Sequence, residues 1–136
     1  MSATKTVVLR AFNTQLFEFL DVVISFFPDR EELRTTKTSA EMMKKANPTI
    51  LIKGWLTYFY SKYAAAINSG NLDFFIEKDY ETEAAEMSSS GALGASEFLN
   101  FISEIREPVR LMSPEQKQVV VQYVQNLSRM SVQYAM

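Results

Sequence analysis

The side chains that most often perform catalysis or hold metals are missing from this sequence, because its 136 residues include no histidine and no cysteine. Zinc sites built from thiolates or imidazoles, Ser-His-Asp triads and Cys-His dyads therefore cannot form within this chain. Disulfide bonds are excluded as well, so nothing in the composition points to an oxidising compartment. Carboxylates are the most plausible catalysts that remain.

The best-spaced carboxylates are Asp73 and Glu77, which lie four residues apart and would share one face of a helix. Such a pair can act as general acid and base. The spacing is equally typical of a solvated acidic surface, and we favour that interpretation. The alternating acids of residues 79–83 resemble the start of a calcium loop, but Ala84 and Ser90 stand where glycine and glutamate are required. We therefore predict no enzymatic activity, no metal and no cofactor.

Signals for phosphate binding are weak. Gly91 and Gly94 are close in sequence, but they lack the lysine and the preceding strand of a phosphate-binding loop. Lys44, Lys45 and Lys53 have the right charge to contact phosphates, although lysines are ordinary on helix surfaces. These lysines alone do not indicate a nucleic-acid site.

The distribution of charge also argues against nucleic acid. Residues 1–62 carry nine Lys/Arg and six Asp/Glu, whereas residues 63–136 carry five against ten, and the whole chain has a net charge of −2. Nucleic-acid modules normally show a strongly positive domain charge with a basic cluster. The sequence shows neither, so nucleic acid is disfavoured as the main ligand.

Helices must position these side chains, since apolar residues recur with helical spacing and no stretch alternates like a strand. From about Lys5 to Phe27 they fall three and four apart, which predicts an amphipathic helix that ends before Pro28. Asp29 is predicted to cap a second, less regular helix that runs to about Ala46.

The third predicted helix is the most apolar. Asn47 and Pro48 form a capping residue followed by proline at the first helical position, and Gly70 is the expected terminator after Ser69. Apolar residues cover most of its circumference, which indicates burial on several sides. We therefore place this helix at the centre of the fold.

The rest of the chain predicts a short helical turn, a flexible loop and two more helices. The turn covers 71–78, and the small, polar residues of about 82–96 favour the loop. A helix around residues 98–105 is kinked or ended by Pro108, and a capping box at Ser113 starts the last helix. The sequence thus predicts one all-α domain over residues 1–136, a compact bundle of five to six helices with a central aromatic-rich helix.

Aromatic residues are the one feature that favours a binding function. Trp55, Tyr58 and Tyr60 crowd the third helix, while Phe74 and Phe75 lie in the short turn that follows it. Aromatic side chains are enriched at the centres of protein interfaces. An aromatic stripe at helical spacing is more often part of a core, and this alternative stays open. These five residues are the candidate partner-binding residues.

Several segments in order resemble a known family. They are LRAFNTQLFEFLDVVISFFPDREEL from Leu9, then KKANPTILIKGWLTYFYSKY, INSGNLDFFIEKDY, REPVRLMSPEQK and YVQNLSRMS. Together they are similar to a small helical protein family encoded by large double-stranded DNA viruses of algae and amoebae. The similarity extends from about Leu9 to Ser131, except for residues 83–96. It implies a viral protein and a minor component of the virion, but it supplies no activity and no functional residues.

Two functions are consistent with these features. The first is a non-enzymatic viral structural or protein-interaction module that binds capsid or other viral proteins, or associates with itself. The alternative is an intracellular adaptor or regulator acting on host or replication proteins. No secretion signal is visible and the apolar runs are far shorter than a membrane span, so we expect an intracellular or virion location.

Overall fold

The computed structural model describes residues 2–72 and 95–136, and every regular element in them is helical. The elements are α1 (Ser2–Phe26), α2 (Glu31–Ala46), α3 (Ile50–Gly54), the π-helix η1 (Trp55–Tyr60), α4 (Ser61–Ser69), α7 (Ala95–Arg110) and α8 (Pro114–Ala135). Because α3, η1 and α4 follow one another without a break, the described residues form five helices. The prediction of an all-α bundle is confirmed. Within the described ranges, no helix has the length and apolarity needed to cross a membrane.

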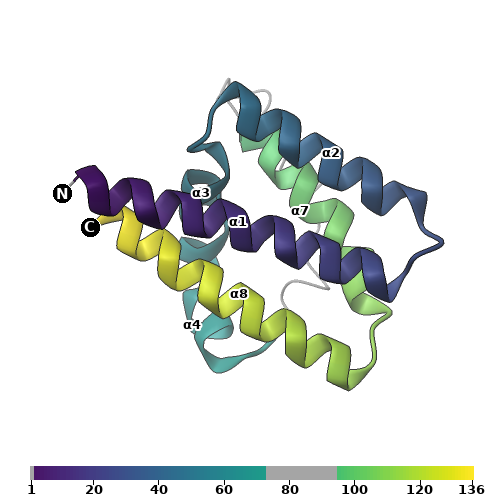
Figure 1. Ribbon diagram of the computed structural model, residues 1–136. Helices are drawn as coiled ribbons and strands as arrows, with labels where there is room; N and C mark the ends of the chain where they lie inside the picture. The colour runs from purple at the N-terminus through teal and green to yellow at the C-terminus, as the bar shows by residue number, and fades with distance from the viewer. Residues whose placement is uncertain (1, 73–94) are drawn as a thin grey trace.

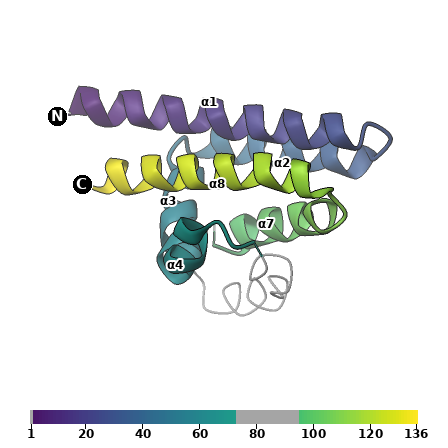
Figure 2. The ribbon, with the colours of Figure 1, turned by 90° about the horizontal axis from the view of Figure 1, so that it is seen from below.

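The helices pack in a bundle with α1 along one side. α1 and α8 lie side by side and antiparallel, so the two ends of the chain come together (Figure 1). α2 folds back along the other flank of α1. The side of the bundle opposite α1 is formed by α7 and by the α3–η1–α4 segment (Figure 2).

The core fills the space between these helices. Its largest side chains are at most 3% exposed. Those from α1 include Phe12, Leu16 and Phe19, and those from the other helices include Leu51, Trp55, Phe98, Ile102 and Leu127. Burying each large apolar side chain contributes about 1.5–3 kcal/mol. This burial, more than helix propensity, is what stabilises the individual helices.

The turn from α1 to α2 differs from the sequence prediction. The residue that precedes α2 is Arg30, which has an extended backbone and no side-chain capping bond, so Asp29 is not the cap. The N–H of Arg30 donates to the carbonyl of Phe27 at 3.1 Å. This bond closes the turn through Asp29 and delays the start of the helix by one residue. Glu31 and Glu32 still lie in the first turn, where the helix dipole favours them.

Asn47 organises the next turn. Its Oδ1 accepts hydrogen bonds from the backbone N–H of Thr49 at 3.0 Å and from the Thr49 hydroxyl at 2.8 Å. Helix α3 therefore begins at Ile50, two residues later than the capping pattern predicted. The side chain of Asn13 on α1 donates to the Pro48 carbonyl at 3.1 Å, which ties this turn to the first helix.

The central helix is present but irregular. In an ideal α-helix, Trp55 and Ile67 would point about 120° apart. The π-helical stretch between them winds more slowly, and both side chains are buried, at 2% and 1% exposure. Tyr63 adds a kink, with φ −127° and ψ 23°. The helix ends at Gly70 as predicted, in the left-handed conformation with φ 79°.

Gly54 lets the central helix approach α7 closely. A Cβ atom at this position would lie 2.8 Å from the ring of Phe98 on α7. That is closer than van der Waals contact allows, so a larger residue would push the two helices apart. A glycine inside a helix costs about 1 kcal/mol relative to alanine, and here the close packing offsets that cost.

The last two helices largely follow the prediction. The capping box is confirmed, because Ser113 Oγ accepts from the Gln116 N–H at 3.2 Å while the Gln116 side chain accepts from the Ser113 N–H at 3.0 Å. Pro108 lies within α7, which continues to Arg110. Proline lacks the backbone N–H that would bond to the carbonyl of Glu104, and α7 ends two residues after it.

The predicted flexible loop at 82–96 is described only in part. α7 already begins at Ala95, so the last two residues of that segment are helical. The rest of the predicted loop lies outside the described residues.

Candidate functional site

Trp55 belongs to the core. Its side chain is 2% exposed, and its indole N–H donates to Ser128 Oγ on α8 at 2.9 Å. Its ring meets Phe12 and Phe59 edge-on, with ring centroids 6.0 and 4.9 Å apart. A partner cannot contact this ring in the present conformation, which removes Trp55 from the candidate contact residues.

The other predicted contact residues have different surroundings. Tyr58 and Tyr60 lie on η1, are half-buried and pack against the core. The Tyr60 hydroxyl accepts a hydrogen bond from the Asn68 side chain at 3.0 Å, so part of its polar end is already satisfied. Phe74 and Phe75 lie outside the described residues. The structure therefore brings the two tyrosines together with Trp55 on one helix but leaves only the tyrosines partly accessible.

Of the residues considered for chemistry, only the lysines lie in the described ranges. Asp73 and Glu77 lie outside the described residues. In the described ranges, no group of three or more Asp or Glu side chains has the geometry to hold a metal ion. Lys44 and Lys45 end α2, and Lys53 lies on α3.

An open groove with a volume of about 680 Å³ lies between α1 and α2. We call it the α1–α2 groove. Its lining comes from one face of each helix and from the turn after α2, and consists of Thr14, Phe17, Glu18, Asp21, Lys37, Glu41, Lys44, Lys45 and Pro48. On α1 these residues are three, four and seven apart, and on α2 they are four, seven and eight apart, so each set forms a continuous wall.

The two walls of the groove differ in charge. The α1 wall carries Glu18 and Asp21, whereas the α2 wall carries three lysines and one glutamate. The walls meet where Lys37 Nζ donates to Asp21 Oδ1 at 2.7 Å. This hydrogen bond is the largest of the effects that raise the pKa of Lys37, and the nearby charges of Asp21 and Glu41 act in the same direction. Lys37 therefore stays an ammonium at neutral pH and contributes a charge rather than a base.

An aromatic ring provides the apolar part of the groove. Phe17 is half-buried, and the Nζ of Lys44 lies 5.5 Å from the centre of its ring. A cation held over a ring face is attracted by the ring quadrupole, which favours this arrangement by about 0.5–1 kcal/mol at an exposed site. The groove thus combines an apolar surface with one acidic and one basic wall.

A second, smaller groove of about 490 Å³ runs between α1 and α8, and four of its eight lining residues are amides. Asn126 donates to the Gln15 side chain across it, and Gln125 donates to the Ile67 carbonyl at 3.0 Å. Tyr123 hydrogen-bonds with Glu18, and burial together with this carboxylate raises the pKa of the Tyr123 hydroxyl. Because these polar groups already pair with one another, this groove offers a ligand less than the α1–α2 groove does.

Sequence reasoning missed the α1–α2 groove because Thr14, Glu18 and Asp21 fall on the polar side of α1 and read as ordinary surface. Asp21 and Lys37 are sixteen residues apart, and only the pairing of the two helices brings them together. A usable signal was present. The short connection between the helices favours antiparallel neighbours, and aligning them that way sets the acids of α1 against the lysines of α2.

The chain matches no protein-family model, no curated protein and no solved structure. Its function therefore has to follow from its own geometry, and the α1–α2 groove is the candidate functional site.

Proposed function

We propose that this protein is a non-catalytic interaction module whose α1–α2 groove binds an amphipathic helix of a partner protein. The observation that carries the proposal is the lining of the groove, in which the ring of Phe17 accompanies the acids of α1 and faces Lys44 of the basic wall. Amphipathic helices commonly dock in such grooves through an apolar stripe. The opposite charges of the two walls would set the direction in which the helix lies.

The size of the groove fits this occupant. Thr14 and Asp21 mark the ends of the α1 wall, and seven residues of helix rise about 10 Å. That length accommodates about two turns of a partner helix. A partner with one apolar stripe, basic residues toward α1 and acidic residues toward α2 would match the groove in both shape and charge.

The resemblance to a family of large DNA viruses suggests the setting. We propose that the partner is a capsid or other viral protein and that the module is a minor structural component of the virion. The alternative is an adaptor that uses the same groove on a host or replication protein inside the infected cell. The two differ in where the protein accumulates, which makes them separable by experiment.

The test is to block the groove by a substitution and to measure how much of the protein is incorporated into virus particles. Thr14→Trp places a large ring in the groove, and Thr38→Trp makes the same change at an exposed position of α2 that does not line it. Copy number relative to the capsid protein is measured by quantitative mass spectrometry of purified particles of the encoding virus. We expect a constant ratio for the wild type and for Thr38→Trp, and at least a tenfold loss for Thr14→Trp.

Two results would contradict the proposal. Absence of the wild-type protein from clean particles would overturn the virion role. Equal incorporation of Thr14→Trp and the wild type would overturn the role of the groove. Circular dichroism of Thr14→Trp and Thr38→Trp checks that both variants are folded. A photo-crosslinking side chain at position 14 then distinguishes an adduct with a second copy of this chain from an adduct with another viral protein.

A further inference from the structure

Among the described residues, cations without neighbouring acids in sequence gather at one end of the bundle. Residues 2–17 and 42–72 contain Lys and Arg but no Asp or Glu. The fold brings these stretches together where α1 begins, α2 ends and α3 begins. Five exposed cations lie there, and we call this surface the basic end; they are Lys5, Arg10, Lys44, Lys45 and Lys53.

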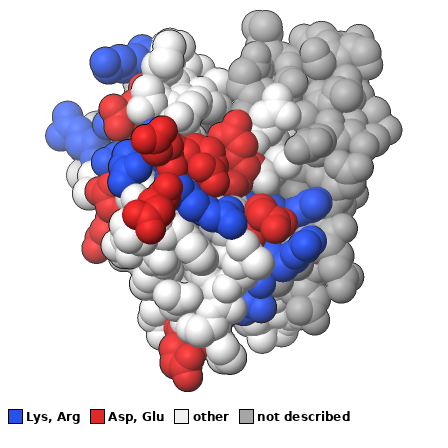
Figure 3. Space-filling model, turned by 90° about the vertical axis from the view of Figure 1, so that its right-hand side faces the viewer, with Lys and Arg blue, Asp and Glu red and all other residues white. Residues whose placement is uncertain are grey.

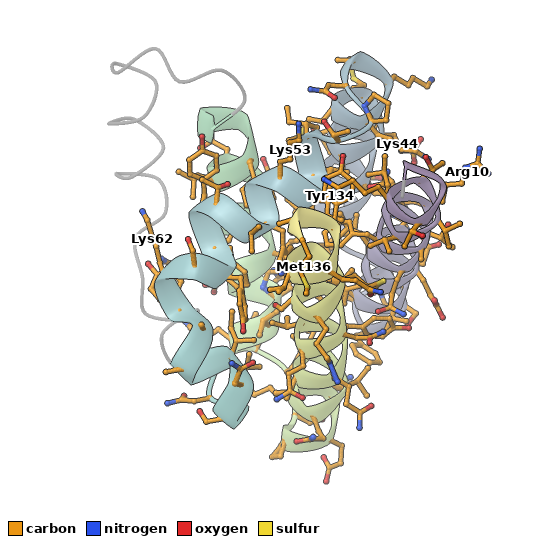
Figure 4. The ribbon with its side chains drawn as sticks, turned by 90° about the vertical axis from the view of Figure 1, so that its left-hand side faces the viewer. Arg10, Lys44, Lys53, Lys62, Tyr134 and Met136 are labelled. Atoms are coloured by element: carbon orange, nitrogen blue, oxygen red, sulfur yellow. The ribbon has the colours of Figure 1, made fainter. Side chains whose placement is uncertain are left out.

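Two views show how the charge is divided. Figure 4 shows Arg10, Lys44 and Lys53 spread over this end on α1, α2 and α3, around the last turn of α8 with Tyr134. On the described part of the opposite end, acidic and basic side chains are interspersed (Figure 3). That end includes the pairs Arg30–Glu32 and Arg110–Glu107, each with N···O at 3.8 Å. The asymmetry is therefore a property of the fold, which a net charge of −2 conceals.

Exposed apolar side chains accompany these cations. Val7 is 65% exposed and lies three residues before Arg10 on α1, and Val132 is 36% exposed near the end of α8. Between the two helices, Lys5 Nζ lies 5.0 Å from the centre of the Tyr134 ring. Cations, an aromatic ring and exposed valines thus lie near the same end of the bundle, where α1 begins and α8 ends (Figure 1), and this combination is typical of proteins that lie on anionic membranes.

We propose that the basic end binds the surface of an anionic lipid bilayer. Each Lys or Arg close to such a surface strengthens binding about fivefold, and the effect decays within a Debye length. The valines favour lipid over nucleic acid, because they would enter the boundary between headgroups and acyl chains but would gain nothing beside a phosphate backbone. This surface is separate from the α1–α2 groove except at Lys44 and Lys45, which line both.

The experiment measures sedimentation of the full chain with vesicles of phosphatidylcholine, with or without about 30% phosphatidylserine, at about 0.1 M salt. The variant Lys5→Gln, Arg10→Gln, Lys53→Gln leaves the groove intact. We expect wild-type protein to bind only the vesicles that contain phosphatidylserine. The triple variant should bind them about 100-fold more weakly.

A matched control removes three cations from the opposite end, as Arg30→Gln, Arg110→Gln, Lys117→Gln, and should bind like the wild type. Val7→Ser, Val132→Ser should weaken vesicle binding while leaving the charges unchanged. An equal loss in the control variant, or no wild-type binding to these vesicles, overturns the proposal. Binding of a 30-nucleotide single strand that is lost in the triple variant but unaffected by the valine substitutions, without vesicle binding, would identify a nucleic-acid surface instead.

The Thr14→Trp experiment leaves the basic end unchanged, and the vesicle experiment leaves the α1–α2 groove unchanged. The proposal of partner binding and the proposal of lipid binding can therefore fail independently.

Discussion

Inside the core, a hydrogen bond between two buried side chains joins the central helix to α8. The Trp55 indole donates to Ser128 Oγ at 2.9 Å, and the serine hydroxyl donates onward to the Val124 carbonyl at 2.7 Å. Both side chains are at most 2% exposed, so water cannot replace a lost partner. A buried donor left without an acceptor costs about 1–3 kcal/mol.

Ser128→Ala is therefore expected to lower the free energy of unfolding by about 1–3 kcal/mol. In a Trp55→Phe background, which has no indole N–H, the same substitution should cost close to nothing, because alanine is also the better helix former. Urea unfolding of the two single variants, the double variant and the wild type measures this coupling. Equal costs of Ser128→Ala in both backgrounds would show that the hydrogen bond contributes nothing.

The central helix shows most clearly what an element's sequence can and cannot predict. Its position in the core followed from its apolar circumference, and its end followed from Gly70. The π-helical stretch did not follow, because nothing local in Trp55–Tyr60 distinguishes a π turn from an α turn. We infer that it is selected by the burial of both Trp55 and Ile67, and that burial depends on α8 and other distant segments.

Deleting Thr57, which is exposed, tests this account of η1. In a continuous α-helix one residue shorter, Trp55 and Ile67 would again point within about 20° of each other. We expect the deletion variant to fold and its free energy of unfolding to change by less than about 1 kcal/mol. Thermal unfolding followed by circular dichroism provides the measurement.

The control for this deletion is removal of Ser103 from α7, which has no π turn to absorb the change. Residues after the deletion, including Ile105 and Val109, would rotate out of the core. This deletion should lower the free energy of unfolding by at least about 3 kcal/mol. Similar losses of unfolding free energy for the two deletions would mean that η1 does not contain one residue more than a continuous α-helix needs.

At the scale of the whole molecule, the contacts of α1 with α2 and α8 make the stability of the fold depend on alkaline pH. Burial and Glu18 raise the pKa of Tyr123 on α8, and the hydrogen bond with Asp21 raises the pKa of Lys37 on α2. A group whose pKa is raised in the folded state favours folding while it is protonated. Its contribution is complete below its unfolded pKa, about 10 for tyrosine and 10.4 for lysine, and is lost as the pH rises through the folded value.

We therefore expect the free energy of unfolding to fall above about pH 10. Tyr123→Phe and Lys37→Met should each make the decrease shallower, because each removes one of the titrating groups. The urea midpoint measured at intervals between pH 8 and pH 11 checks this, with Tyr134→Phe as the control. A decrease of the same steepness in all variants would assign the alkaline sensitivity to other residues.

On the same scale, the sequence predicted the class of fold but not the surfaces. Helix ends such as the capping box at Ser113 are encoded within four residues and could be predicted. The α1–α2 groove and the basic end depend on which helices become neighbours, and periodicity alone does not contain that information. The aromatic residues singled out for binding illustrate the same point, since the ring of Trp55 proved to be buried.

The antiparallel pairing of α1 with α8 also has a consequence for the protein while it is being made. Gln15 and Asn126 touch across this pair although 111 residues separate them in the chain. At the usual rates of translation, the roughly 90 residues between the end of α1 and the start of α8 take about 5–18 s to synthesise. Throughout that interval the phenylalanines and leucines of α1 lack their main covering helix. A nascent chain with such an exposed apolar face is a natural client for chaperones at the ribosome, and its folding is completed only after α8 has emerged.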